Sequence, residues 1–267
     1  MKHNLLPALL LATLTLNAAP PSKIDVSRLP QQTRVIGDVI VPVPSEIFGV
    51  LDKLNSKPRW AEVLRPMKGV AKPTGEQAQV ALYLGTVIAE GFVAVEAEDS
   101  DQVQKIGRSV LSLSEALGVS KAVKKRANAI IDAGDKKEWK LVRKELDRAL
   151  SEVRDAMAEL GSEQLSQLVS LGGWLRGTEA LCAVVSAAYS RDGADLLHQP
   201  VLLDYFGQQL DGLKGRYKKS SVIGKIQTGL KDIRPLIGLS DGAEISAKSV
   251  HEVGMISAGL VKTIQSR

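Results

Sequence analysis

The sequence predicts an all-α protein: a single-domain antiparallel helical bundle of about eight helices with an extended N-terminal arm. Two observations carry this prediction. Aromatic residues make up only 4% of the chain, and residues of high helix propensity dominate, which favours helices over a sandwich or barrel. Short turns containing Gly or Pro separate stretches with apolar residues at helical spacing, and such turns make neighbouring helices antiparallel.

The first 19 residues have the layout of a secretory signal peptide. Lys2 and His3 give a basic start, residues 5–16 form an apolar stretch, and small residues follow at 17–19. This stretch is too short for a transmembrane helix, which needs about 20 residues. We therefore expect residues 1–19 to be a cleavable signal, the mature chain to have no transmembrane span, and the protein to be periplasmic or secreted.

Cys182 is the only cysteine of the 267 residues. An exported chain without a disulfide depends on its hydrophobic core for stability, so small disulfide-stapled folds are excluded. The lack of disulfides also favours a bacterial protein over a eukaryotic secreted module. The remaining length is sufficient for one large core, and we expect residues 44–267 to form one helical domain.

Residues 20–43 are predicted to form an extended arm, because they are rich in proline and show no helical period. Within the arm, β-branched residues flank Gly37-Asp38, which is the signature of a two-residue hairpin turn. A lone hairpin is marginally stable in water, so we expect the arm to lie against the helical body.

Capping residues, apolar spacing and helix breakers define the expected helices. Thr74 is expected to cap one of them, with Gln77 three residues later as in a capping box. Helix breakers are expected in the gaps: Gly118, Gly134, Gly161, Gly193 and Pro235. The expected helices span residues 45–54, 74–97, 100–117, 120–132, 135–160, 162–189, 199–213, 218–233 and 240–264.

Two of these helices are predicted to be central, because residues 80–95 and 171–189 are apolar on almost every side. A Gly inside a helix costs about 1 kcal/mol relative to Ala, so repeated small residues indicate that another backbone comes close. We therefore expect the two helices to cross, or each to meet a neighbour, at short distance. The small residues at spacing four are Ala81, Gly85 and Ala89 in one helix, and Gly173 and Gly177 in the other.

Three charged residues interrupt the central helices: Glu90, Arg176 and Glu179. Arg176 and Glu179 are three residues apart and share a helix face, so the favoured interpretation is an ion pair at the edge of the core. The alternative is a pocket for a small ligand or substrate, formed by these three residues with Tyr83 and Trp174. Two carboxylates in such a pocket could serve as acid and base if burial separated their pKa values.

The sequence offers little support for metal, cofactor or nucleophile chemistry. After the signal, the only histidines are His198 and His251, and neither has the spacing of a helical metal site. Cys182 lies in an apolar run typical of a buried thiol. The hydrolase elbow and the phosphate loop are absent. We therefore expect no metal and no cofactor, and an enzyme is less expected than a non-catalytic protein.

The segment from 214 to 234 is strongly basic and also carries an apolar stripe. We favour a surface helix whose stripe faces the core, and the alternative is an amphipathic helix on an anionic membrane surface. Nucleic acid is not expected, because only Tyr217 offers a stacking ring. The basic residues are Lys214, Arg216, Lys218, Lys219, Lys225, Lys231 and Arg234.

These observations give three expectations for function. The leading one is an exported, non-catalytic binding or scaffolding protein that contacts another protein or an envelope component. The second is a small-ligand binder or enzyme with the pocket described above. The third is peripheral attachment to an anionic membrane through residues 214–234. The sequence gives no oligomeric state.

Overall fold

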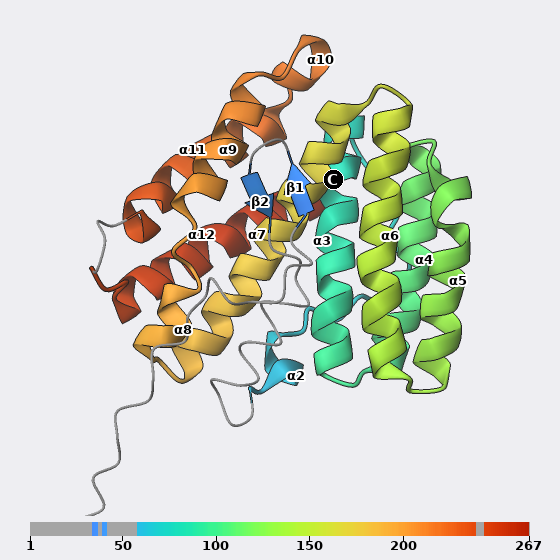
Figure 1. Cartoon of the computed structure of the whole chain (residues 1–267), viewed down its shortest axis with the longest axis horizontal. Coiled ribbons are helices and arrows are strands. Elements are labelled where there is room, and N and C mark those ends of the chain that lie inside the picture. The colour runs from blue at the N-terminus through green and yellow to red at the C-terminus, as the bar shows by residue number, and fades with distance from the viewer. Residues whose placement is uncertain (1–33, 37–38, 42–57, 239–242, 267) are drawn as a thin grey trace, which may run out of the picture.

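The structure is a computed structural model that describes residues 34–36, 39–41, 58–238 and 243–266. The expected signal, most of the expected arm and the expected helix at 45–54 lie outside the described residues. Within them the predicted all-α bundle is confirmed (Figure 1). The helices are α2 (Trp60–Val63), α3 (Gln77–Glu96), α4 (Ser100–Ala116), α5 (Ser120–Asp135), α6 (Trp139–Glu159), α7 (Glu163–Ala187), α8 (Arg191–Asp195), α9 (Pro200–Asp211), α10 (Gly215–Lys218), α11 (Ser221–Ile237) and α12 (Ala247–Gln265).

The helices form two groups, and α7 joins them. Helices α3, α4, α5 and α6 lie side by side, and each contacts two of the others, which closes a four-helix bundle. Helix α7 contacts α3 and α6 on one side and α12 on the other, and α11 and α9 follow outward from α12 (Figure 1). The buried apolar residues of both groups belong to one hydrophobic core.

Helices α3 and α7 cross at backbone contact, as their small residues predict. A Cβ atom added at Gly85 would lie 1.9 Å from the carbonyl oxygen of Val169, and one added at Gly172 would lie 2.0 Å from that of Leu82. No other residue type fits at these two positions. The crossing differs in detail from the expected one, because Gly177 has no atom within 4 Å of an added Cβ.

Two short strands lie where the sequence predicts a hairpin. Strands β1 (Arg34–Ile36) and β2 (Val39–Val41) pair antiparallel, with Val35 opposite Ile40. Strand β2 lies against α9, so this part of the arm contacts the helical body.

The expected cap at Thr74 is wrong. Helix α3 begins after Glu76, whose side chain makes no capping hydrogen bond. Gly75 has a φ of +79°, which turns the chain between Thr74 and the helix. The Thr74 hydroxyl is left buried and without a hydrogen-bond partner among the described residues.

Several expected helix boundaries are also wrong, including the starts of α6 and α11, which were expected at residues 135 and 218. Helix α5 continues through Gly134, because Lys137, with a φ of 56°, makes the turn instead. Helix α11 continues past Pro235 to Ile237, whose side chain is fully buried in the core. Helix α12 begins at Ala247 rather than near residue 240, because the Ser246 hydroxyl caps it by accepting from the backbone N of Ser249. The short helix α8 includes Gly193, which was expected in a gap.

Helices α3 and α7 are each long and apolar enough to cross a membrane by length and composition alone. Their most apolar windows are 94% and 89% buried inside the fold. The central helix of a folded core has this same combination of length, apolar composition and burial.

Candidate functional site

The side chain of Arg176 lies in the core and joins three parts of the chain. It is only 1% exposed, and its Nε donates a hydrogen bond to Glu90 Oε2 on α3. Its Nη2 donates to the carbonyl oxygen of Val63 at 2.8 Å, and its Nη1 lies 3.5 Å from Glu179 Oε2. The expected pair of Arg176 and Glu179 is therefore present, and a second carboxylate joins it.

A fourth charge, Arg65, completes this group. Its guanidinium pairs with Glu179 Oε1, and its backbone N donates to Glu90 Oε1 at 2.6 Å. Positive and negative charges alternate in the order Arg65, Glu179, Arg176, Glu90, so the group is neutral. Such alternation is what offsets the cost of removing buried charges from water. We call these four residues the ion cluster.

The ion cluster holds one end of an extended segment, residues 64–72, which we call the strap. The strap crosses α3 and α4, and its backbone N–H groups donate to buried side chains of those helices. Met67 N donates to Gln102 Oε1 at 2.7 Å, and Ala71 N donates to Ser109 Oγ at 2.8 Å. With the bond from Arg65 to Glu90, three backbone N–H groups of the strap, at residues 65, 67 and 71, are bound by side chains of the two helices.

Sequence reasoning missed Arg65, Gln102 and Ser109. Gln102 and Ser109 carry one available signal, because they are polar residues on the side of α4 that also bears buried Val103 and Ile106. A buried polar side chain needs a partner, so each position indicates a hydrogen bond to another element. The sequence does not show which element supplies it.

Burial dominates the electrostatics of Glu179. Removal from water raises the pKa of its carboxyl group, and the positive charges of Arg176 and Arg65 oppose this effect. The Tyr83 hydroxyl is half-buried, and its pKa is raised for the same reason, so it remains a hydrogen-bond donor at neutral pH.

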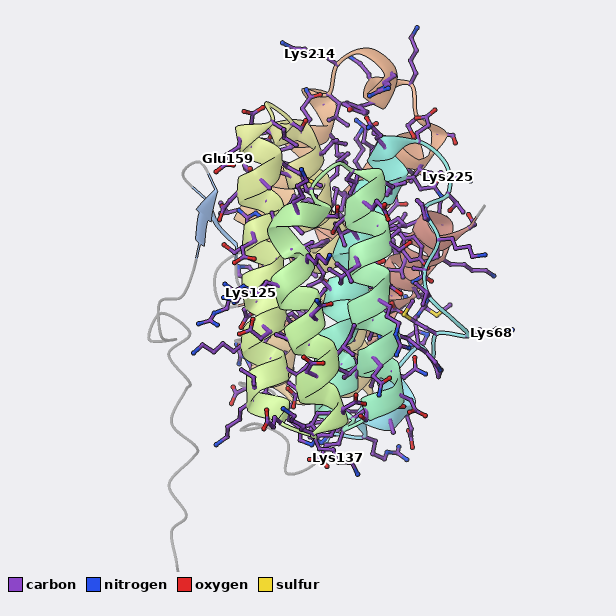
Figure 2. All side chains as sticks on the ribbon, turned by 90° about the vertical axis from the view of Figure 1, so that its right-hand side faces the viewer. Lys68, Lys125, Lys137, Glu159, Lys214 and Lys225 are labelled. Atoms are coloured by element: carbon purple, nitrogen blue, oxygen red, sulfur yellow. The ribbon has the colours of Figure 1, made fainter. Side chains whose placement is uncertain are left out.

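A pocket of about 470 Å³ opens between the strap, α3 and the end of α12. Glu90 and Tyr83 line it, whereas Arg176 and Glu179 do not. Lys68 lines it from the exposed bend of the strap, and Figure 2 shows this residue at the edge of the molecule. The lining residues are Arg65, Pro66, Met67, Lys68, Gly69, Tyr83, Val87, Glu90 and Gln265.

Trp174 lies apart from the ion cluster and from this pocket. Its indole Nε1 donates to Gln199 Oε1 at 3.0 Å, and its ring lies 5.8 Å from that of Phe206 on α9. The structure therefore brings together three of the five expected pocket residues, adds Tyr83 to the pocket that Glu90 lines, and leaves Trp174 elsewhere.

The basic segment from 214 to 234 forms α10 and α11 at the surface. Its whole apolar stripe is buried in the core, as the favoured interpretation expects. Arg234 makes two hydrogen bonds to the Asp204 carboxylate, at 2.6 and 2.8 Å, and Arg216 donates to Gln77 Oε1. The lysines of the segment are exposed. The stripe consists of Val222, Ile223, Ile226, Leu230 and Ile233.

Metal and thiol chemistry have no evident place among the described residues. No group of three His, Cys, Asp or Glu side chains within them could hold a metal ion. Cys182 is buried, and burial raises the pKa of its thiol, which keeps the sulfur protonated and unreactive.

Fold and site together define a class: an all-α bundle in which a neutral buried ion cluster ties an extended strap to two crossing helices. Comparisons with protein-family models, curated proteins and solved structures found no match.

Proposed function

We propose that the protein is an exported, non-catalytic helical binding protein that contacts another protein or an envelope component. The observation that carries this proposal is that Glu90 and Arg176 of the ion cluster form hydrogen bonds to other parts of the chain. Glu90 accepts one hydrogen bond at each carboxylate oxygen, and Arg176 donates from Nε and Nη2. A general acid or base must exchange its proton with a substrate, whereas one oxygen of Glu90 accepts from the strap and the other accepts from Arg176.

Contact with a partner can be tested with a photo-crosslinking amino acid placed at exposed apolar positions in the full chain. Leu160, Val201 and Met255 are the most exposed of the large hydrophobic residues. Lys140, which is exposed on α6 among mixed charges, serves as the control position. A discrete adduct from one of the three positions in the exporting cell supports the proposal. Equal labelling from all four positions, or none from any, contradicts a protein partner at these faces.

Export has its own test in the mass of the purified protein. The proposal expects cells to secrete, or release from the periplasm, a chain that lacks residues 1–19. Lys2→Glu together with Leu10→Arg would break the basic start and the apolar stretch of the signal. We expect that variant to remain unprocessed in the cytoplasm. A parent chain of full mass in the cytoplasm would contradict export.

The pocket beside the strap favours a second candidate function, which is binding of a small organic anion. Its volume of about 470 Å³ falls within the usual range for small-molecule sites, about 300–1,000 Å³. Tyr83 offers a hydroxyl donor, Lys68 a positive charge, and Met67 and Val87 apolar contacts.

Titration with benzoate, followed by amide chemical shifts, tests this candidate. We expect shifts confined to the strap and to the pocket face of α3, and weaker binding in Lys68→Gln and Tyr83→Phe. Lys72→Gln, on the strap but outside the pocket lining, is the matched control. Shifts that are absent, or scattered over the whole surface, would dismiss this candidate.

A further inference from the structure

The hairpin of α9 and α11 ends in a projecting, basic turn. Figure 1 shows α10 at the outer end of this hairpin, beyond the neighbouring helices. Lys214 directly precedes α10, Lys218 is its last residue, and Lys219 follows it. All three are exposed, and no ion pair among the described residues includes them. We call these three residues the lysine tip.

The stretch after the lysine tip carries no acidic residue, and the nearest acidic residues along the chain are Asp211, three residues before Lys214, and Asp232. No Asp or Glu occurs between Lys214 and Lys231. The opposite end of the molecule differs, because Lys136 and Lys137 there are flanked by Asp135 and Glu138. Figure 2 shows Lys214 and Lys137 at these two ends.

The lysine tip is fixed to the bundle by its neighbours. Arg216 donates to Gln77 Oε1, at the beginning of α3, and the Tyr217 hydroxyl donates to the same oxygen at 3.2 Å. The Arg216 guanidinium also lies 5.2 Å from the centre of the Tyr217 ring. These contacts hold α10 against the body, so the backbone that carries the three lysines does not have to be ordered on binding.

We propose that the lysine tip docks electrostatically on an anionic phospholipid surface. A convex end that carries three ammonium groups matches a flat layer of phosphate headgroups, whereas a polymer chain would call for a groove. The buried apolar stripe of α11 means that docking occurs at headgroup level, without insertion of a hydrophobic face. This inference rests on the proposed binding function, for which it names the contacting surface and the partner.

The test is sedimentation of the full chain with phosphatidylglycerol-containing vesicles and with phosphatidylcholine vesicles. A lysine near an anionic leaflet is worth about fivefold in partition coefficient. We therefore expect Lys214→Gln, Lys218→Gln and Lys219→Gln together to lower binding to the anionic vesicles by roughly 100-fold. Binding of the parent should also disappear at about 0.5 M salt, where the Debye length is short.

The matched control removes the same charge from the other end of the molecule: Lys136→Gln, Lys137→Gln and Lys140→Gln. It should bind as the parent does, and both triple variants should keep the parent's melting temperature. Equal loss in the two variants would overturn the proposal, because net charge alone would then explain binding. A parent that binds polyphosphate but not anionic vesicles would also overturn it.

The docking surface and the wider binding function can fail separately. If vesicle binding is absent but an adduct forms at Leu160, Val201 or Met255, the docking role of the lysine tip is wrong and the wider binding function still stands. If vesicles bind and no adduct forms, the docking role of the lysine tip is supported and a protein partner at those three positions is contradicted.

Discussion

Arg176 of α7 and Glu90 of α3 form a buried ion pair across 86 positions of the chain, and Glu90 holds the strap through its other oxygen. The pair therefore connects three segments: α3, α7 and the strap. Its two members have unequal roles, since only Arg176 also binds the carbonyl oxygen of Val63 and approaches Glu179.

We expect Arg176→Met to lower the free energy of unfolding by about 3–5 kcal/mol, because it leaves Glu90 buried without its cation. Urea denaturation measures this loss. The control is Arg234→Met, which breaks an exposed pair with Asp204 and should cost less than about 1 kcal/mol. Adding Glu90→Gln to Arg176→Met should restore part of the loss. Equal costs for the two single variants would mean that the cluster does not hold the fold.

Gly85→Ala should destabilise the protein by at least about 2 kcal/mol, because the new methyl group would meet the backbone of α7. The matched change is Gly177→Ala, also in a central helix, where nothing lies within 4 Å of the added Cβ. It should stabilise the fold by about 0.5–1 kcal/mol through helix propensity. Thermal denaturation of both variants decides the matter, and similar effects of the two would contradict the close crossing.

Ser109→Ala should loosen the strap, since Ala71 N would lose its acceptor. We expect faster hydrogen exchange at the Ala71 amide and a cost of about 1–3 kcal/mol. Ser114 is the control on the same helix, as it is equally buried and its hydroxyl has no hydrogen-bond partner among the described residues. Ser114→Ala should be neutral or stabilising, and protection of Ala71 should not change. Unchanged exchange in Ser109→Ala would show that the strap is held by other contacts.

Glu179 should contribute more to the free energy of unfolding in acid than at neutral pH. Because its pKa in the folded state is raised above the ordinary value of 4.5, the folded protein binds more protons than the unfolded chain in this range. The contribution is complete below that value and is lost as the pH rises through the raised pKa. Urea denaturation at a series of pH values measures this effect. Between acid and neutral pH the parent should lose free energy of unfolding that the Glu179→Gln variant does not lose.

Asp204 should affect the pH dependence of stability in the opposite direction, because hydrogen bonds from Arg234 lower the pKa of its carboxyl group. Its contribution is present above the ordinary value of 3.8 and is lost as the pH falls through the lowered pKa. The parent should therefore lose stability as the pH falls in the acid range, and Asp204→Asn should remove this part of the loss. If Glu179→Gln behaved in this way as well, attraction to Arg65 and Arg176 would outweigh burial at Glu179.

The sequence predicts the helices and the residues that do not suit an apolar core, but not what those residues hold. Glu90, Arg176 and Glu179 stand out because charges interrupt apolar helices. Arg65 has no such signal, since it lies in a proline-containing connection where a charge is ordinary. Its role depends on residues far along the chain, and no local pattern reports such a distance.

The helix crossing shows the same limitation on a smaller scale. Repeated glycines indicate that a neighbouring backbone comes close, yet neighbouring residues of a helix point about 100° apart. Gly172 and Gly173 therefore face different directions, and only the packed structure shows that an added Cβ at Gly172 would meet Leu82.

The hydrogen bond from Arg176 to Val63 joins residues 113 positions apart, so the acceptor is synthesised long before its donor. The strap emerges early, and Gln102 and Ser109 follow it soon after. The cation that neutralises Glu90 arrives only with α7. Until then the strap would have to dock over an uncompensated carboxylate, so we expect its final attachment to follow synthesis of the second half of the chain.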